Sequence, residues 1–555
     1  MAARLPVVLL WHMHQPQYRD ALTGEYVQPW TALHAIKDYA DMAAHLEATP
    51  AARAVVNFTP VLLEQLESLA GEVGRYLDSG APLRDPVLAA LVEAAPRDPA
   101  LRLALVRALL RAQRTQMIEP LPIFRELVDL AESFATPARI AYASDAYIAD
   151  LAVWYHLAWT GETIRRSDAR VAALMEQGRG FQPDDRRRLL GVIGETLASI
   201  VPRYRALAQA GRCELSVSPY SHPILPLLCD LAVARESLPD SPLPRHAAYP
   251  GGRERADWQM AEALRVFTRA FGARPAGCWP SEGAVSDEAL AVIERHGLAW
   301  VASSAGVLQA SLPGAEADRP YRRPGRTLDC WFRDDGLSDL IGFTYAGWHG
   351  DDAVAHFVAS LTEIARRRAG SSQHAVLVAL DGENAWEHYP QNGYHFLKGL
   401  YAALAEHPAL ELTTLGALGA RDLQPAALPR VRAGSWVHAT LATWIGDADK
   451  NAAWDLLCVA KLAHDRVLAS GALSPEAVVA AERQLALCES SDWFWWFGDY
   501  NPAEAVAQFD QLFRRQLATL YRLLALEPPI ALENPVSRGG GAMEQGGVMR
   551  RATAG

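Results

Sequence analysis

The sequence predicts an α/β protein in which a parallel sheet or barrel carries a helical insertion and is followed by a helical domain. Short apolar runs without alternation recur in the first and middle parts of the chain, as in parallel strands covered on both faces. Residues 61–210 and the chain after residue 410 instead repeat apolar residues at helical spacing. With 555 residues, the chain is also too long for one compact core.

Seven runs are short and rich in apolar or β-branched residues, and we interpret each as a strand. Their short length and lack of alternation indicate strands buried on both faces. The predicted strands are Pro6–Trp11, Ala54–Phe58, Cys213–Val217, Ala276–Trp279, Leu298–Ser303, Asp339–Phe343 and Ala375–Leu380.

The same patterns divide the chain into domains. Residues 1–410 are predicted to form the α/β domain, with the helical insertion at about 61–210. Residues 411–533 should form the helical domain. The last segment, 534–555, is Gly-rich and poor in large apolar residues, so we expect a disordered tail.

Composition excludes several classes of function. A net charge of −11 without a dense Lys/Arg run argues against a nucleic-acid partner. No stretch approaches the ~18 unbroken apolar residues of a membrane span. The apolar run Leu5–Trp11 is short and lacks a following cleavage site, so it indicates a first strand rather than a signal peptide. Six scattered cysteines indicate reduced, buried thiols, and we expect a cytoplasmic protein.

Polar motifs directly follow four of the predicted strands. Because the carboxyl ends of parallel strands lie on one face, where substrates bind, these motifs should converge on one surface. The motifs are His12-Met-His14-Gln-Pro, Pro-Tyr-Ser-His222-Pro, Trp279-Pro-Ser-Glu282-Gly and Asp381-Gly-Glu383-Asn-Ala-Trp386.

The residue types on that surface suit sugar chemistry. The sequence has neither a GxxxxGK[ST] phosphate loop nor a GxSxG nucleophile elbow, which leaves carboxylates, histidines and 16 tryptophans. Indole rings stack on the C–H faces of sugars, while carboxylates bind their hydroxyls. Any single tryptophan is still more often a core residue, although the stretch "DWFWWFGDY" is hard to bury whole.

Glu282 and Asp381 are the best-placed pair for glycoside hydrolysis, which needs two carboxyl groups flanking the scissile bond. Each has a simpler interpretation: Glu282 as a charge at a helix N-terminus, and Asp381-Gly as a turn. The accompanying histidine motifs favour the catalytic interpretation of both.

Five segments resemble, in order, the signature regions of glycoside hydrolase family 57, closest to its amylopullulanase and α-amylase-like branch. The segments are "WHMHQPQY", "GRCELSVSPYSHPILPLL", "GCWPSEGAVS", "LDGENAWEHYP" and "SSDWFWWFGDY". The resemblance implies an incomplete, TIM-like (β/α)7 barrel with a helical insertion and a C-terminal helical domain. It also implies a retaining mechanism on α-glucans such as starch or glycogen, acting on α-1,4 bonds, with no cofactor and no obligatory metal; whether α-1,6 bonds are also cleaved stays open.

The resemblance also assigns roles. Glu282 matches the nucleophile and Asp381 the general acid/base, so that Asp381 needs a raised pKa. The remaining matches would line the substrate cleft, with the last three contributed by the helical domain. These residues are His12, His14, Glu214, His222, Trp279, Glu383, Trp386, Asp492, Trp493 and Trp495.

Three alternatives stay open. A 4-α-glucanotransferase would use the same residues, although Asn384-Ala-Trp386 replaces the "FG" that branching and transferring members carry. A metal-dependent enzyme of the α-mannosidase or deacetylase kind is suggested by His12-Met-His14, but Gln15-Pro16 stands where an acidic ligand is expected. A non-catalytic glucan-binding protein is the third alternative.

Overall fold

The computed structural model describes residues 4–134, 136–421, 423–541 and 549. Seven parallel strands close into a barrel, in which β1 pairs with β2 on one side and with β8 on the other. This confirms the predicted (β/α)7 barrel. In spatial order the strands are β1 (Leu5–Met13), β2 (Ala54–Phe58), β3 (Cys213–Val217), β4 (Gly277–Cys278), β5 (Trp300–Ser304), β7 (Asp329–Arg333) and β8 (Val376–Asp381).

One predicted strand is wrong and one real strand was missed. Asp339–Phe343 is helical: α16 (Asp335–Asp339) is followed by a π-helical turn, Leu340–Thr344. The Asp334 side chain caps α16 by accepting from the Leu337 N–H at 2.9 Å. Apolar periodicity cannot separate strand from helix in so short a run. The missed strand is Asp329–Arg333. A charged residue at each end leaves an apolar run of only three residues, which is too short to indicate a strand.

Three short strands extend the sheet beyond the barrel. They are β6 (Tyr321–Arg322), which is antiparallel to β7, β9 (Leu410–Leu412), which is parallel to β1, and β10 (Ala426–Ala427), which pairs with β6. Two of them follow the predicted domain boundary at residue 410, so the barrel domain continues past that residue.

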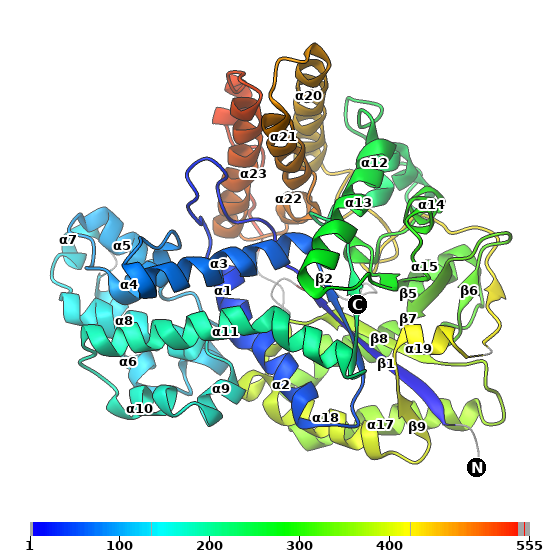
Figure 1. The fold of residues 1–555 in the computed structure, drawn as a ribbon, viewed down its shortest axis with the longest axis horizontal. Helices are drawn as coiled ribbons and strands as arrows, with labels where there is room; N and C mark the ends of the chain where they lie inside the picture. The colour runs from blue at the N-terminus through cyan, green and yellow to red at the C-terminus, as the bar shows by residue number, and fades with distance from the viewer. Residues whose placement is uncertain (1–3, 135, 422, 542–548, 550–555) are drawn as a thin grey trace.

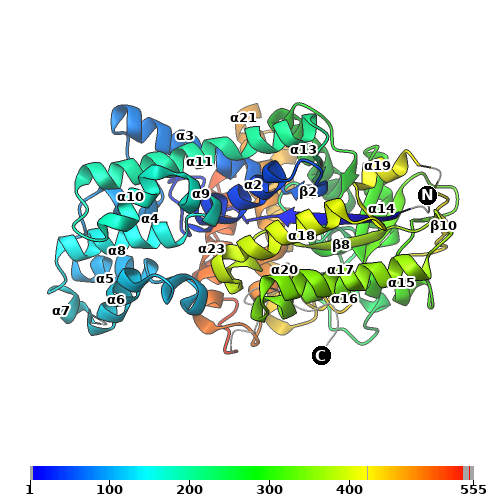
Figure 2. The same cartoon turned by 90° about the horizontal axis from the view of Figure 1, so that it is seen from below.

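Helices between β2 and β3 build a lobe beside the barrel, shown in blue and cyan in Figures 1 and 2. The long helices α3 and α11 pack against each other and connect the lobe to the barrel. The insertion was predicted at about 61–210, in the same part of the chain. Its helices are α3 (Pro60–Ser79), α4 (Pro86–Val92), α5 (Pro99–Ala108), α6 (Pro122–Ala131), α7 (Pro137–Ile140), α8 (Asp145–Ala158), α9 (Glu162–Ser167), α10 (Ala169–Gln177) and α11 (Pro183–Gln209).

Except for α1, which reaches the pocket, the remaining helices of the barrel domain cover its outer surface, and the amphipathic α13 and α17 each bury one apolar face against it. These helices are α1 (Trp30–His34), α2 (Ala40–Ala48), α12 (Leu225–Cys229), α13 (Gly252–Phe271), α14 (Asp287–Arg295), α15 (Ala305–Ser311), α17 (Gly350–Arg367), α18 (Tyr394–Glu406) and α19 (Leu415–Gly419). Among the described residues, no helix combines the length and apolar character needed to cross a membrane.

The C-terminal helical domain stands on the barrel as the brown and red helices of Figure 1. It contains α20 (Ala448–Ser470), α21 (Pro475–Cys488), α22 (Ser491–Trp496) and α23 (Ala503–Leu523). The first part of the predicted disordered tail packs on it, because the Val536 N–H donates to Asp510 and the Gly540 N–H donates to the Asn501 carbonyl. The rest of that prediction, at 542–548 and 550–555, lies outside the described residues.

A buried ion pair joins the helical domain to the barrel. The carboxylate of Glu489, which is 1% exposed, accepts from Arg255 Nε on α13 at 2.7 Å. Tyr249 and Gln259 each add a hydrogen bond of 2.7 Å to the same carboxylate. The network fixes the start of α22, whose Ser491 N–H donates to the His222 carbonyl at 3.0 Å.

Arg255→Ala should therefore lower the free energy of unfolding by about 3–5 kcal/mol, because it leaves the Glu489 carboxylate buried without its cation. Chemical denaturation measures the effect. The matched control is Arg265→Ala, whose exposed pair with Glu262 should contribute no more than about 1 kcal/mol. Equal effects of the two substitutions would contradict this role for the Glu489 pair.

Candidate active site

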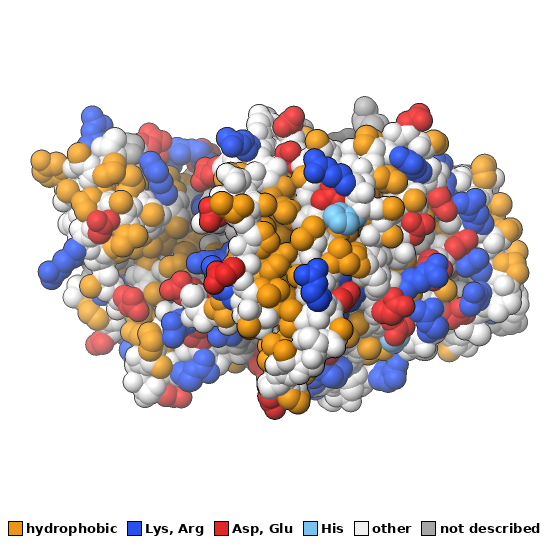
Figure 3. Space-filling view, turned by 90° about the horizontal axis from the view of Figure 1, so that it is seen from above, with side chains coloured by type: hydrophobic (Ala, Val, Ile, Leu, Met, Phe, Trp, Pro, Cys, Tyr) orange, Lys and Arg blue, Asp and Glu red, His pale blue; other side chains and the backbone are white. Residues whose placement is uncertain are grey.

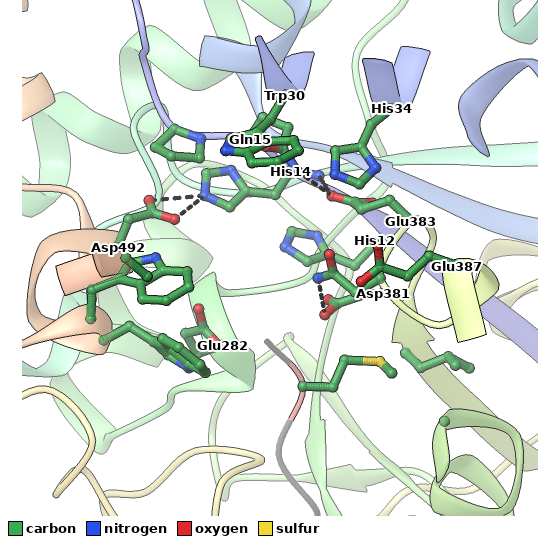
Figure 4. A pocket seen from close by; sticks show the side chains of 18 of the residues that line it. His12, His14, Gln15, Trp30, His34, Glu282, Asp381, Glu383, Glu387 and Asp492 are labelled. Atoms are coloured by element: carbon green, nitrogen blue, oxygen red, sulfur yellow. Dashed lines mark hydrogen bonds and ion pairs between the residues drawn. The ribbon is translucent and has the colours of Figure 1, made fainter. Parts of the chain in front are cut away.

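A pocket of about 530 Å³ lies at the carboxyl end of the barrel strands. Its walls come from the barrel loops, from the helical insertion and from the helical domain, which contribute Asp381, Arg111 and Trp495, among others. In Figure 3 the surface is hollowed between the insertion and the helical domain, and hydrophobic side chains gather there. The predicted convergence of the strand-end motifs is visible in Figure 4, where His14, Glu282, Asp381 and Asp492 surround one cavity.

Glu282 is held in a strained turn just after β4. Its φ of 59° lies in the left-handed region, which is uncommon for a residue with a side chain and is often found at functional sites. Trp436 fixes this turn twice, since its backbone N–H donates to the Glu282 carbonyl at 3.1 Å and its indole N–H donates to Glu282 Oε2 at 2.9 Å. His222 Nδ1 lies 3.9 Å from Glu282 Oε1. The carboxyl of Glu282 is thus fixed in the pocket.

Asp381 is the last residue of β8, in register with His12 of β1. A Cβ at the next residue, Gly382, would lie 2.2 Å from Met13 Sδ, so a larger residue there would have to displace the buried Met13 side chain. The Gly382 N–H donates to the His12 carbonyl at 2.7 Å, which continues the sheet pairing to the strand end. Asn384 Nδ2 donates to Asp381 Oδ2 at 2.8 Å. Asp381 therefore enters the pocket from a rigid strand.

The two carboxyl groups influence each other's ionisation. Burial, together with the charge of Asp381, raises the pKa of Glu282 to about 8. Burial also raises the pKa of Asp381, against the hydrogen bond from Asn384. The pair titrates as a unit and retains a proton more readily than two exposed carboxylates would.

Three histidine rings stack beside the carboxyl groups, with a centroid separation of 3.8 Å between His14 and His222 and of 5.0 Å between His12 and His222. Burial lowers the pKa of His12 to about 3 and that of His222 well below its ordinary value, so both rings are neutral at neutral pH. His14 Nε2 contacts both Asp492 oxygens, at 3.1 and 3.0 Å, and this contact ties the barrel to the helical domain.

Glu383 lies deeper, with 2% of its surface exposed. Its Oε1 accepts from the His14 N–H at 3.0 Å and from the Tyr39 hydroxyl at 3.2 Å. Burial, followed by the charge of Asp381, raises the pKa of Glu383 well above its ordinary value. Glu383 Oε2 is buried and has no hydrogen-bond partner among the described residues.

The structure does not bring all of the predicted site residues into the pocket lining. Glu214 is the second residue of β3 and lies near the opposite end of that strand, where it accepts from Trp300 Nε1 and the Gly416 N–H, both at 2.7 Å. Trp279 packs behind the site against Trp436, with ring centroids 5.1 Å apart. Trp386 and Trp493 are buried, with their indole N–H groups bound to the carbonyls of Gly382 and Leu487. Trp495 and Asp492 do line the pocket.

Other lining residues escaped sequence reasoning. Trp436, Trp30 and Trp159 reach the pocket from segments without a strand-end motif, and Arg333 ends β7, the strand that the sequence did not predict. Met549, close to the C-terminus, also lines the pocket and is 8% exposed. The only available signal was the large number of tryptophans, which does not distinguish lining residues from core residues.

One group of side chains in the pocket has metal-ligand chemistry. His14, His222 and Asp492 offer ligand atoms that all lie within 4.8 Å of one another. These atoms already interact within the protein: His14 with Asp492, and His222 with His12 at 3.1 Å and with the Ser491 hydroxyl at 2.9 Å.

The family model that matches this barrel indicates a glycoside hydrolase or glycosyl-transferring enzyme. The chain belongs to glycosyl hydrolase family 57, whose family model matches residues 8–426.

Solved structures share the fold. A family 57 branching enzyme from Thermococcus kodakaraensis is 14% identical with a TM-score of 0.58, covering 95% of this chain and 93% of its own. An α-amylase from Thermotoga maritima is 13% identical with a TM-score of 0.57, covering 94% of each chain. A 4-α-glucanotransferase from Thermococcus litoralis is 12% identical with a TM-score of 0.50, covering 94% of this chain and 60% of its own. No curated protein sequence matches the chain.

Proposed function

We propose that this protein is a retaining enzyme that cleaves α-1,4-glucosidic bonds of starch, glycogen or maltodextrins. The observation that carries the proposal is the pair of partly buried carboxyl groups, Glu282 and Asp381, that enter one pocket from the ends of β4 and β8. A retaining mechanism needs one carboxylate as nucleophile and one carboxylic acid as proton donor.

In the first step, Glu282 attacks the anomeric carbon. The bond to the leaving oxygen breaks as Asp381 gives that oxygen its proton, and a glycosyl ester of Glu282 results. In the second step, Asp381 takes a proton from water as the water oxygen attacks the same carbon and releases Glu282. The carboxyl group of Glu383, whose Oε2 has no hydrogen-bond partner among the described residues, is positioned to hydrogen-bond a hydroxyl of the bound sugar.

Two observations support an α-glucan as substrate. The pocket combines tryptophan rings with hydrogen-bonding groups, which is the combination that sugar rings require. The structurally similar proteins include an α-amylase, a branching enzyme and a 4-α-glucanotransferase, which supports the same substrate class for this chain.

Product analysis with maltoheptaose and pullulan tests the proposal. We expect shorter maltodextrins from maltoheptaose, first released as the α-anomer, which NMR detects before mutarotation. Maltotriose from pullulan would add α-1,6 cleavage to the activity. Release of the β-anomer would refute the retaining mechanism, and failure to cleave any α-glucan would favour a non-catalytic glucan-binding protein.

A metal-dependent reaction is the second candidate, because His14, His222 and Asp492 could hold a cation. We expect dialysis against a chelator to leave the rate of maltoheptaose cleavage unchanged, since two carboxyl groups suffice for the proposed steps. As a control, Zn²⁺ is added back to the dialysed enzyme and the rate of cleavage is measured again. A chelator-dependent loss that Zn²⁺ reverses would favour the metal-dependent mechanism.

The pH dependence follows from the shared proton. Between the lower and the upper pKa of the pair, the two groups share one proton, and the reactive form has that proton on Asp381 and a carboxylate at Glu282. Above the upper pKa both groups are ionised and the acid is lost. We therefore expect kcat/KM for maltoheptaose to fall as the pH rises through about 8, the raised pKa of Glu282. Maltoheptaose has no ionisable group in this pH range, so the profile of kcat/KM against pH reports only the ionisation of the enzyme. A profile already falling at pH values of about 5, as for ordinary carboxyl groups, would contradict the raised pKa.

A further inference from the structure

The pocket has a wall that the proposed bond cleavage does not use. Trp30, His34 and Trp159 line it, and none of them contributes to the steps above. In Figure 4, His34 and Glu387 lie on the same side of the cavity as Asp381, whereas Glu282 and Asp492 lie on the other side. Because Asp381 protonates the leaving oxygen, the sugar that leaves, or the sugar that replaces it, lies on the Asp381 side.

Charged partners hold the His34 ring in position. His34 Nδ1 lies 2.7 Å from Asp38 Oδ2, and Asp38 is fully buried. Lys37 Nζ is 2.5 Å from the other Asp38 oxygen and 3.0 Å from Asn392 Oδ1. The ring stands edge-on to Trp159, with centroids 5.5 Å apart and an interplanar angle of 88°. Since a buried ion pair adds little net stability, orienting His34 is a better account of the Lys37–Asp38 pair than stability is.

The local backbone brings these partners inward. Between α1 and α2 the helix widens into a π turn, Ala35–Tyr39, in which all five residues are buried. Such turns are rare and occur frequently at functional sites. The same turn positions Tyr39, whose hydroxyl donates to Glu383 Oε1 at 3.2 Å. The π turn therefore connects His34 to the loop that follows Asp381.

The Asp38 carboxylate also sets the tautomer of His34. A carboxylate accepts the proton of Nδ1, which leaves the lone pair of a neutral imidazole on Nε2. Nε2 has no hydrogen-bond partner among the residues that the structure describes, and the ring lines the pocket. His34 thus presents a hydrogen-bond acceptor to the cavity beside the rings of Trp30 and Trp159.

We propose that His34 is an acceptor-binding residue: its Nε2 accepts a hydrogen bond from a hydroxyl of the sugar that receives the glycosyl group from Glu282. This proposal rests on the proposed retaining mechanism. One hydroxyl of the acceptor sugar attacks the anomeric carbon, the ester bond to Glu282 breaks, and the proton goes to Asp381. A second hydroxyl of the same sugar binds His34, which takes no proton. Water has no second hydroxyl to bind there, so the site favours transfer over hydrolysis.

The test uses α-maltotriosyl fluoride as donor and maltose as acceptor. Fluoride release measures formation of the glycosyl-enzyme, and chromatography separates the longer transfer product from maltotriose. For His34→Ala we expect the maltose concentration that gives half-maximal transfer to rise at least 10-fold. His34→Leu, which retains more of the side-chain volume, should behave alike, and His34→Gln, whose amide oxygen can accept a hydrogen bond, should restore part of the transfer. The matched control is His395→Ala, an exposed histidine outside the pocket, which should retain the wild-type dependence on maltose.

The outcomes separate the two proposals. An unchanged maltose dependence in both His34→Ala and His34→Leu would overturn the role of His34, as would a loss of transfer no larger than the loss of fluoride release. A wild-type enzyme that yields no transfer product at any maltose concentration would also overturn it. A wild-type enzyme that releases no fluoride would instead overturn the retaining mechanism itself.

Discussion

Glu282→Ala is expected to lower the rate of starch cleavage by about 10⁴- to 10⁶-fold, as removal of a covalent nucleophile does. The indole N–H of Trp436 donates to the carboxyl group of Glu282 and holds it in the pocket, and no other described carboxylate accepts from this N–H. The matched control is Glu288→Ala on the exposed start of α14, which should leave the rate unchanged. The effect of Glu282→Ala on stability should be small, because this substitution removes a partly buried carboxyl group whose burial is unfavourable.

Adding azide to the Glu282→Ala variant tests whether Glu282 is the nucleophile rather than another essential residue. Small enough to enter the space left by the carboxyl group, azide can attack α-maltotriosyl fluoride from the face that Glu282 occupied. A single inversion then gives the β-glycosyl azide, which NMR identifies. The α-azide from Glu282→Ala, or a cleavage rate within about ten-fold of the wild-type rate, would show that Glu282 is not the nucleophile.

Asp381→Ala should lower starch cleavage by about 10²- to 10⁴-fold, the usual contribution of a general acid/base. Fluoride is a good leaving group that needs no proton, so release from α-maltotriosyl fluoride should be reduced much less than starch cleavage. Asp351→Ala, an exposed aspartate at the start of α17, serves as the control. Equal losses on both substrates would contradict the role of Asp381 as the acid.

Azide again separates the two carboxyl groups. In Asp381→Ala the glycosyl ester on Glu282 still forms, and azide attacks it without needing a general base. Two successive inversions give the α-glycosyl azide, the opposite of the product expected from Glu282→Ala. If the two variants gave each other's products, the nucleophile and acid assignments would have to be exchanged.

The sequence predicted the architecture wherever the local pattern was unambiguous. Buried strands such as Ala54–Phe58 and Cys213–Val217 were placed to the residue, because their apolar runs are bounded by clear breaks. The run Asp339–Phe343 was misplaced, because five apolar-rich residues fit either a strand or a turn of helix and the Asp334 cap favours the helix.

The same distinction holds for the candidate site. Glu282, Asp381, His12, His14 and His222 could be located because each directly follows a strand or ends one, and parallel strands put those positions on one face. Glu214 could not be assigned in this way, since its motif begins at the other end of β3. Trp279, Trp386 and Trp493 look like lining residues in the sequence, but they pack as core residues.

By itself, then, the sequence determined most of the buried strands and the two carboxyl groups at or after their ends, because apolar runs and the polar motifs that bound them are properties of local segments. The closed barrel was expected only from the resemblance to a known family. Only the tertiary structure decided which aromatic rings face the cavity and which groups tune the carboxyls. Trp436 reaches Glu282 across 154 positions, and Asp492 reaches His14 across 478. Contacts between segments so far apart depend on how domains pack, which no periodicity in the chain encodes.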